Sequence, residues 1–356
     1  MVRLLLAAIF VTLVGLPLTG ARAWERPKVI DFHAHLDPSA GARIKGILDR
    51  SGIELIVNLS GGSFPWEWKE AQALSTELGG RVINFYTPDW DEIDDPAWGL
   101  AEAFRLDAAV KRFGFAGLKI AKALGLYVRD AAQVLVDVDD PRLDPLWAKA
   151  GELGVPVCIH VGDPKAFWRP STPDNERYEE LQVHPRWSFY GEPVPSQEAL
   201  LDQLARVVAR HPLTTFVAVH FGNDPEDPGY VERMLERFPN YFIDVAARVP
   251  EIGRHDPARM RALFTRFQDR ILFATDLGVG RYGIMLGSTG TDAPTDDDAA
   301  RFYATHWRYF ETHDRQFEHP TPIQGKWKID AVGLPPEVLD KIYRKNALKL
   351  LRRGPA

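Results

Sequence analysis

The residues of this chain that could do chemistry begin with two histidines near the N-terminus. His33 and His35 stand in the segment Asp31-Phe32-His33-Ala34-His35, directly after a short apolar run. Because side chains alternate across a β-strand, the two imidazoles project from the same side of an extended segment. Two imidazoles on one side can bind the same cation. The spacing therefore suggests one half of a metal site.

Three further residues of the same kind close later apolar segments. His160, His220 and Asp276 each end a predicted strand, and each is followed within two residues by glycine. Imidazole and carboxylate groups suit Zn²⁺, and also Mn²⁺ or Fe²⁺. The recurrence predicts that all five side chains belong to one metal-dependent site.

The rest of the chain alternates short apolar segments with longer amphipathic ones, as repeated βα units do. Eight near-continuously apolar segments indicate buried parallel strands. No glycine-rich phosphate-binding turn follows the first of them, which disfavours an open dinucleotide-binding sheet. We expect one (β/α)8 TIM barrel, in which the carboxyl ends of all strands meet at one mouth. The predicted strands are residues 28–33, 53–59, 82–87, 115–120, 155–160, 215–220, 241–246 and 271–276, with helices predicted over 96–112, 144–153, 196–210, 228–238 and 257–267.

Two predicted loops are longer than a barrel requires. Residues 162–195 follow the fifth strand and residues 278–330 follow the eighth, so both come after candidate ligands. Long loops on this face are usually binding elements, and a contact within a homo-oligomer is the alternative. His184, Trp187 and Tyr190 of the first loop are candidates to line a pocket.

Several of these segments together resemble a known family. The chain resembles the amidohydrolase-related proteins of the amidohydrolase superfamily, which are TIM-barrel metal enzymes that include hydrolases and non-oxidative decarboxylases such as aminocarboxymuconate semialdehyde decarboxylase. The resemblance implies that His33, His35, His160 and Asp276 bind the metal, and that His220 is a catalytic histidine or a ligand of a second metal. It covers nearly all of the chain after residue 23 and is carried by Ile30-Asp31-Phe32-His33-Ala34-His35, Gly117-Leu118-Lys119, Val157-Cys158-Ile159-His160, Val219-His220-Phe221-Gly222, Leu272-Phe273-Ala274-Thr275-Asp276 and Tyr343-Arg344-Lys345-Asn346-Ala347.

Lys119 ends the fourth predicted strand, where some members of the superfamily have a carbamylated lysine that bridges two metals. We interpret Lys119 as a contact for a substrate carboxylate, with Lys122 as a weaker competitor, and therefore expect one divalent metal, zinc first. Charged residues at the seventh strand could also grip an anionic substrate through an arginine fork, or could form salt bridges with one another. These residues are Asp244, Arg248, Glu251 and Arg254.

An open metal site suggests hydrolysis, because a divalent metal lowers the pKa of bound water towards neutrality. Asp276 would accept the water proton and His220 would protonate the leaving group of an amide, lactone or ester. The alternative is decarboxylation of an unsaturated or aromatic acid, with His220 handling the proton and Lys119 or Arg248 holding the carboxylate. An alternative of another class is a barrel that binds a metal or ligand without catalysis, which would need no water-activating residues.

Composition limits which partners we expect for this chain. The formal net charge of −6 leaves no broad positive field for phosphate backbones, so nucleic acid is excluded as an expected partner and a small molecule, for instance a carboxylate, is favoured. The single cysteine, Cys158, is predicted to fill the core and excludes an intrachain disulfide. Five histidines fit no strand end and are predicted to lie at the surface: His211, His255, His306, His313 and His319.

The first 23 residues have the pattern of a secretory signal peptide. Arg3 precedes an almost wholly apolar run, and Ala21-Arg22-Ala23 is a small-x-small cleavage site. The run is too short for a membrane span and is interrupted by Gly15 and Pro17. We expect export to the periplasm or the extracellular space, no stable membrane insertion after cleavage, and one mature domain over residues 24–356.

Cleavage is testable on its own. We predict that exported protein begins at Trp24, which mass analysis of its N-terminus will show. An intact form that starts at Met1 and stays in the membrane would contradict the signal peptide.

Overall fold

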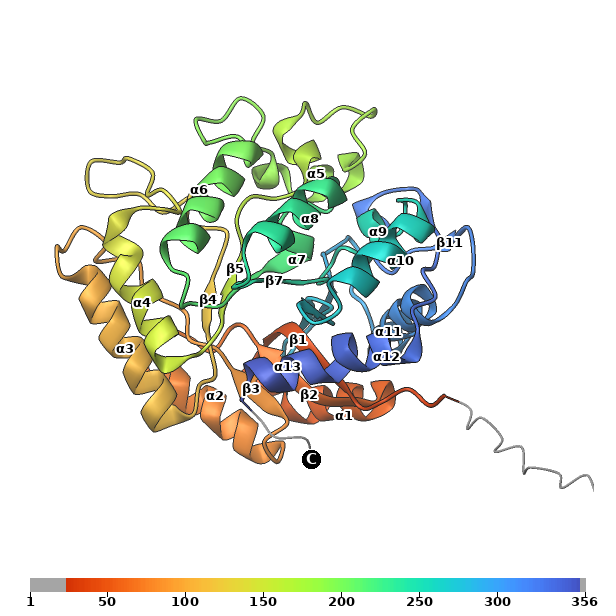
Figure 1. The fold of residues 1–356 in the computed structure, drawn as a ribbon, viewed down its shortest axis with the longest axis horizontal. Coiled ribbons are helices and arrows are strands. Elements are labelled where there is room, and N and C mark those ends of the chain that lie inside the picture. Colours follow the sequence, from red (N-terminus) through yellow and green to blue (C-terminus); the bar gives the residue numbers. More distant parts are fainter. Residues whose placement is uncertain (1–23, 353–356) are drawn as a thin grey trace, which may run out of the picture.

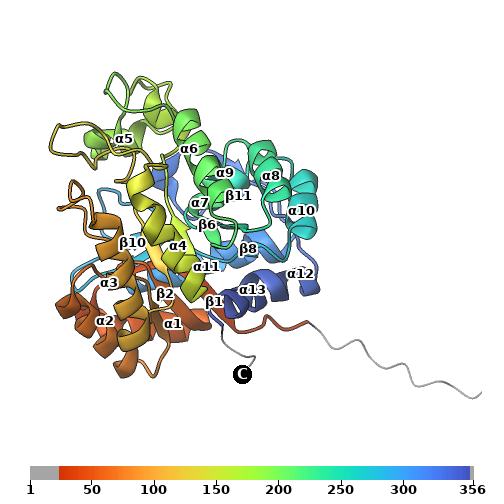
Figure 2. The same cartoon turned by 60° about the vertical axis from the view of Figure 1, so that its left-hand side comes forward.

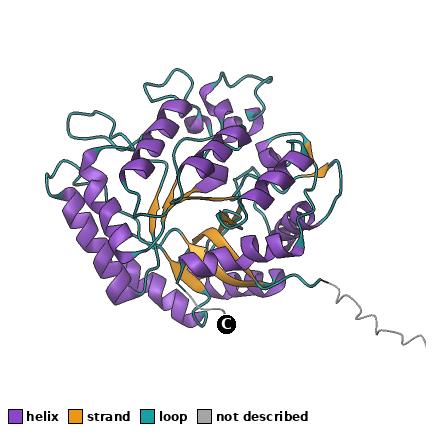
Figure 3. Cartoon of the chain, in the orientation of Figure 1, coloured by secondary structure: helices purple, strands orange, loops and turns teal. Residues whose placement is uncertain are grey.

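The computed structural model describes residues 24–352. Strands occupy its centre and helices surround them (Figures 1 and 3). The predicted signal peptide, residues 1–23, lies outside the described residues. No helix within residues 24–352 is long and apolar enough to cross a membrane.

Eight parallel strands form the centre, three of them (β1 to β3) in one five-stranded sheet together with β9 and β10, and five (β4 to β8) in the other. All eight predicted strands are confirmed in place, although most are shorter than predicted. They are β1 (Val29–Leu36), β2 (Ile53–Asn58), β3 (Val82–Asn84), β4 (Leu118–Ile120), β5 (Val157–Ile159), β6 (Phe216–Ala218), β7 (Tyr241–Asp244) and β8 (Ile271–Leu272).

Two sets of backbone contacts join the sheets into a ring. Tyr86, just past β3, makes a parallel bridge to Leu118 of β4. On the other side, the chain continues past β8 into β9 (Leu277–Val279), which pairs in parallel with β1. The amide of Phe32 also donates to the carbonyl of Phe273, 3.0 Å away. The predicted barrel is therefore closed by the same short segment that contains Asp276.

Helices cover the outside of this ring in the predicted βα order, and α3 and α4 lie side by side (Figures 1 and 2). Three of the five predicted helices begin next to a capping side chain that accepts backbone N–H groups: Ser196, Asp227 and Asp256. The helices are α1 (Gly41–Ser51), α2 (Pro65–Glu77), α3 (Trp98–Phe113), α4 (Asp144–Leu153), α6 (Gln197–Arg210), α8 (Pro228–Arg237), α10 (Pro257–Arg266), α11 (Asp296–Glu311), α12 (Pro336–Asp340) and α13 (Asn346–Leu350).

Strand alternation divides the apolar residues into two cores. Ile30 and Phe32 of β1 point into the barrel, whereas Val29 packs in the larger cluster beneath the helices, and so does Ala34, which follows an irregularity in the β1–β2 pairing. Cys158 belongs to the interior cluster and is fully buried, which confirms its assignment to the core.

The long loops lie at the mouth, as predicted. The loop after β5 includes α5 (Tyr178–Val183), a short helix α9 (Val249–Ile252) follows β7, and the loop after β8 includes β10 (Ile284–Leu286), β11 (Phe317–Glu318) and β12 (Lys328–Ile329). In Figure 1, α5 lies near the top, and α9 and β11 lie on the right.

Two of the five histidines predicted at the surface are buried instead. His306 of α11 is fully buried against Phe273 and Phe302, and His319 is 5% exposed. Each imidazole makes a hydrogen bond with a backbone carbonyl, of Phe302 and of Gly325 respectively, both at 2.8 Å. Such a bond lets a neutral histidine pack in an apolar core. A histidine that does not end a predicted strand is therefore not necessarily exposed.

Candidate metal centre

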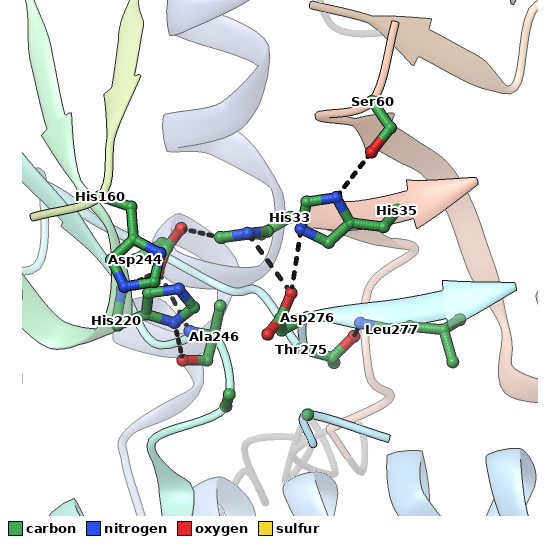
Figure 4. A network of polar contacts seen from close by, with 12 residues as sticks. His33, His35, Ser60, His160, His220, Asp244, Ala246, Thr275, Asp276 and Leu277 are labelled. Atoms are coloured by element: carbon green, nitrogen blue, oxygen red, sulfur yellow. Dashed lines mark hydrogen bonds and ion pairs between the residues drawn. The ribbon is translucent and has the colours of Figure 1, made fainter. Parts of the chain in front are cut away.

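The two β1 histidines converge on one carboxylate oxygen (Figure 4). Oδ1 of Asp276 lies 3.5 Å from Nε2 of His33 and 3.3 Å from Nε2 of His35. These three side chains form a compact group whose potential ligand atoms all lie within 4.8 Å of one another. Three of the four predicted ligands are thus brought together.

The opposite nitrogen of each imidazole has a partner of its own. Nδ1 of His33 lies 2.9 Å from Oδ2 of Asp244, and Nδ1 of His35 lies 2.7 Å from Oγ of Ser60. A carboxylate only accepts, so Asp244 fixes the proton of neutral His33 on Nδ1. Nε2 of His33 is then a lone pair that faces the acceptor oxygen of Asp276.

Two acceptors that face each other in a buried site need a positive charge between them. His33 Nε2 and Asp276 Oδ1 are both buried and neither has a hydrogen-bond partner. Burial holds the pKa of His33 well below its usual range, so the ring stays neutral. Burial would raise the pKa of the Asp276 carboxyl, but the close contact with His35 and the other nearby imidazoles outweigh it and hold that pKa below its ordinary value. A divalent cation fits this donor set.

Asp276 and His220 differ from prediction in one respect, because neither lies on a regular strand. Asp276 has φ 63°, and the run from His220 to Asn223 has φ between 55° and 72°. Residues other than glycine rarely adopt this left-handed region, which costs roughly 1 to 3 kcal/mol each. Such strain is concentrated at active sites, where surrounding contacts hold it in place.

Asp244 supplies the contact that holds His220. Its Oδ1 accepts the backbone N–H of His220 at 2.7 Å, while Nδ1 of the His220 ring lies 2.8 Å from the carbonyl of Ala246. The carbonyl can only accept, so the proton is on Nδ1 and Nε2 is free to take one up. Burial also keeps the pKa of His220 well below its usual range. His220 is therefore a neutral base beside His33, with ring centroids 5.0 Å apart.

His160 lines the same cavity but stands outside the compact group. Its ring lies 4.2 Å from that of His220, and its Nε2 is 3.8 Å from Oδ1 of Asp163. Burial holds its pKa well below the usual range, so it too is neutral. His160 as fourth ligand stays a prediction.

A cavity of about 220 Å³ opens beside these residues. Lys119 lines it and is 3% exposed, and its Nζ has no hydrogen-bond partner. Burial lowers the pKa of this lysine. Arg248 lines the cavity as well and is 6% exposed. The cavity thus has a cationic side next to the metal centre.

Glu251 occupies a different place from the one expected of a substrate contact. It is fully buried, does not line the cavity, and forms an ion pair with Arg177, which in turn donates to Glu180 at 2.7 Å. Glu251 also lies 4.0 Å from Arg248. These charges form the salt-bridge network that was the alternative interpretation of this segment. Arg254 is not part of that network and pairs with Glu176.

Sequence reasoning missed three residues of the site. Ser60 orients His35, and Asp163 binds Lys122 at 2.7 Å. Phe167 lines the cavity together with Trp187, which was expected there. Of the other two aromatic candidates, His184 stacks on Trp187 with centroids 3.9 Å apart, and Tyr190 is 59% exposed. The one sequence signal for Asp163 and Phe167 is their position in the long loop that follows the candidate ligand His160.

Comparison with known proteins agrees with this geometry. A family model described as amidohydrolase matches residues 95–353. The chain belongs to the amidohydrolase family. Among the curated proteins, none matches it in sequence.

Solved structures of amidohydrolases share the fold at low sequence identity. A 2,6-dihydroxybenzoate decarboxylase, in complex with 2,6-dihydroxybenzoate, is 15% identical, with 91% of this chain and 99% of that chain covered and a TM-score of 0.50. An amidohydrolase from Burkholderia multivorans with bound HEPES is 13% identical, with 92% and 100% covered and a TM-score of 0.51. These likenesses support the barrel, which the amidohydrolase match also implies.

The roles of Asp276 and His220 can be separated by metal content. We predict that Asp276→Asn loses metal affinity and that its activity falls by roughly 10² to 10⁴ or more, since it removes the anionic ligand and a proton acceptor. His220→Asn is expected to keep its metal and lose turnover, and asparagine tolerates the left-handed backbone. Elemental analysis, circular dichroism and turnover of both variants decide this. If His220→Asn loses metal as fully as a His160 variant, His220 is a ligand.

Asp244→Asn tests the orientation of His33. The amide would donate to Nδ1 of His33, move the ring proton to Nε2, and so remove the lone pair that faces Asp276. We predict a loss of roughly 10- to 100-fold in metal affinity with the fold retained. Asp224→Asn is the matched control, because Asp224 is equally buried but binds Lys165. Metal affinity that is equal in the two variants would contradict the role of Asp244.

Proposed function

We propose that this amidohydrolase is a metal-dependent decarboxylase of small aromatic or unsaturated carboxylic acids. The sequence alone placed hydrolysis first. The cavity reverses that order, and the observation that carries the proposal is the buried, unpartnered ammonium of Lys119 beside the metal centre.

A buried cation without a counter-ion is costly, so the cavity favours an anionic ligand. Lys119 and Arg248 both line it, and the guanidinium of Arg248 suits a carboxylate. The carboxylates nearby already have partners: Asp244 binds His33, Asp276 lies against both β1 histidines, Asp163 binds Lys122 and Glu180 binds Arg177. A substrate carboxylate would supply the missing charge.

The aromatic residues that line the cavity favour a flat substrate. They are Trp187 and Phe167, with ring centroids 6.2 Å apart and planes 27° from parallel. Trp187 is held by His184, which stacks on it, and by Lys122, whose Nζ lies 4.9 Å from the indole centroid. A volume of about 220 Å³ is below the usual range for drug-sized ligands and suits one ring.

His220 has the features required of the group that handles the proton. Loss of CO₂ breaks a C–C bond, leaves its electron pair on carbon, and requires one proton at that carbon. Neutral Nε2 of His220 can take up a proton and then deliver it, while Nδ1 stays bonded to Ala246. The strained backbone at His220 holds the ring in place, which a binding protein without catalysis would not need.

The bound cation would supply Lewis acidity to substrate oxygens. His33, His35 and Asp276 would hold it, with His160 as the fourth candidate ligand. We propose zinc, because imidazole ligands predominate, with manganese and iron as alternatives.

Hydrolysis of an amide, lactone or ester remains the second candidate. The ionised carboxylate of Asp276 favours it, since this group lies against both β1 histidines and could accept a proton from water. We also propose, from the pattern of residues 1–23 alone, that the protein is exported to the periplasm or the extracellular space. Assembly into a homo-oligomer stays a prediction.

A substrate panel distinguishes the two candidates. Purified metal-loaded protein is incubated with aromatic and unsaturated acids, and CO₂ release is measured beside hydrolysis of lactones, amides and esters. Release of CO₂ with formation of the matching product supports decarboxylation. Turnover confined to the second group would establish the hydrolase instead.

Lys119→Met tests whether the buried amine of Lys119 binds the substrate carboxylate. The change keeps the length of the side chain and removes its charge, so we predict a loss of roughly 10- to 100-fold in kcat/KM for carboxylate substrates, with metal content unchanged at one per chain. Lys122→Met is the control, because its charge is already balanced by Asp163. Equal effects of the two substitutions would argue against Lys119 as the carboxylate contact.

A further inference from the structure

A second hollow adjoins the cavity on the far side of His35. It has a volume of about 510 Å³ and lies between the end of β1 and the β9–β10 hairpin. Its walls come from Leu36, Val279, Ile284 and Met285, together with the glycines of the hairpin. We refer to it as the hairpin groove.

The polar residues of the hairpin groove already have protein partners. Oγ of Ser60 bonds His35, Oδ1 of Asp37 accepts from Ser39, and Oγ1 of Thr289 bonds His184. Most of the surface that lines the groove is apolar. What remains for a ligand is an apolar surface.

His35 and Met285 line both the cavity and the hairpin groove. Gly278 lies opposite Met285 in the hairpin, and a Cβ there would come within 2.9 Å of the Met285 Cβ and 3.4 Å of its Cε. The glycine thus allows the methionine to lie across the hairpin at the junction. Methionine is flexible and adapts to different apolar shapes.

We propose that the hairpin groove is a second substrate site, which binds an apolar chain attached to the acid whose carboxylate lies in the cavity. The proposal rests on the proposed function, because it takes the cavity to hold the carboxylate. The ligand passes Met285, so its carboxylate remains near Lys119 while its chain covers Leu36 and Ile284. The substrate class is a small aromatic or unsaturated acid with a linear aliphatic substituent.

The predicted signature is a dependence of affinity on chain length. Burial of one methylene contributes about 0.8 kcal/mol, which is up to about fourfold in affinity. Straight-chain saturated carboxylates from acetate to octanoate are suitable probes because they are flexible and carry one anionic group. We expect the shortest acids to bind weakly, and affinity to rise with each added methylene once the chain passes Met285.

Gly283→Leu is the blocking variant. Gly283 lines the hairpin groove, a Cβ on it meets no atom within 4 Å, and its φ is not in the left-handed region. The leucine can therefore fill the groove without backbone strain. Tyr282→Ala is the matched control, because Tyr282 is the preceding residue, is 89% exposed and does not line the groove.

The measurement is calorimetric binding of each acid to metal-loaded wild-type, Gly283→Leu and Tyr282→Ala proteins. We expect the gain with chain length to disappear only in Gly283→Leu, with acetate binding equally to all three. If short acids bind and longer ones gain nothing in the wild type, or if Gly283→Leu leaves the gain intact, the second site is wrong while the carboxylate site stands. If no acid of any length binds, the proposed carboxylate site itself fails.

Discussion

The site depends on one buried carboxylate, that of Asp244 at the end of β7. One oxygen orients the ring of His33 on β1, and the other accepts the N–H of His220 after β6. Asp244 is fully buried, and burial raises its pKa to about 6. Asp244 thereby fixes the positions of three segments that are distant in sequence, which are β1, the segment after β6 and the end of β7. Without these two hydrogen bonds, the ring proton of His33 would no longer be fixed on Nδ1, and the left-handed backbone at His220 would lose a stabilising contact.

The positions of the metal-site residues could be predicted because barrel geometry brings strand ends together whatever lies between them. This rule and strand alternation grouped five candidate residues, and the resemblance to the amidohydrolase-related proteins then implied that His33, His35 and Asp276 are among the ligands. The role of Asp244 could not be predicted, because it is one of four charged residues close together in the sequence and its partner, His33, is 211 positions away. For the same reason, the sequence left Glu251 open between a substrate contact and a salt bridge, and only the structure shows Arg177 beside it.

Strand limits were less predictable than strand positions. The predicted sixth and eighth strands extended to His220 and Asp276, since apolar character continues up to both residues. The regular strands end earlier, at Ala218 and Leu272, because the backbone turns to aim these side chains. The apolar sequence pattern indicates which residues are buried. The backbone turn before Asp276 is fixed instead by tertiary contacts, such as the hydrogen bonds that Asp31 accepts from the amide and hydroxyl of Thr275.

The burial of Cys158 has a practical consequence. It is the single cysteine of the chain, its thiol is enclosed in the barrel, and burial raises its pKa well above the usual range. A thiol reacts with maleimide reagents as the exposed thiolate, so the native chain offers them no ready target. A cysteine introduced at a surface position would be the one label site, which allows a fluorophore to be attached without first removing a native residue.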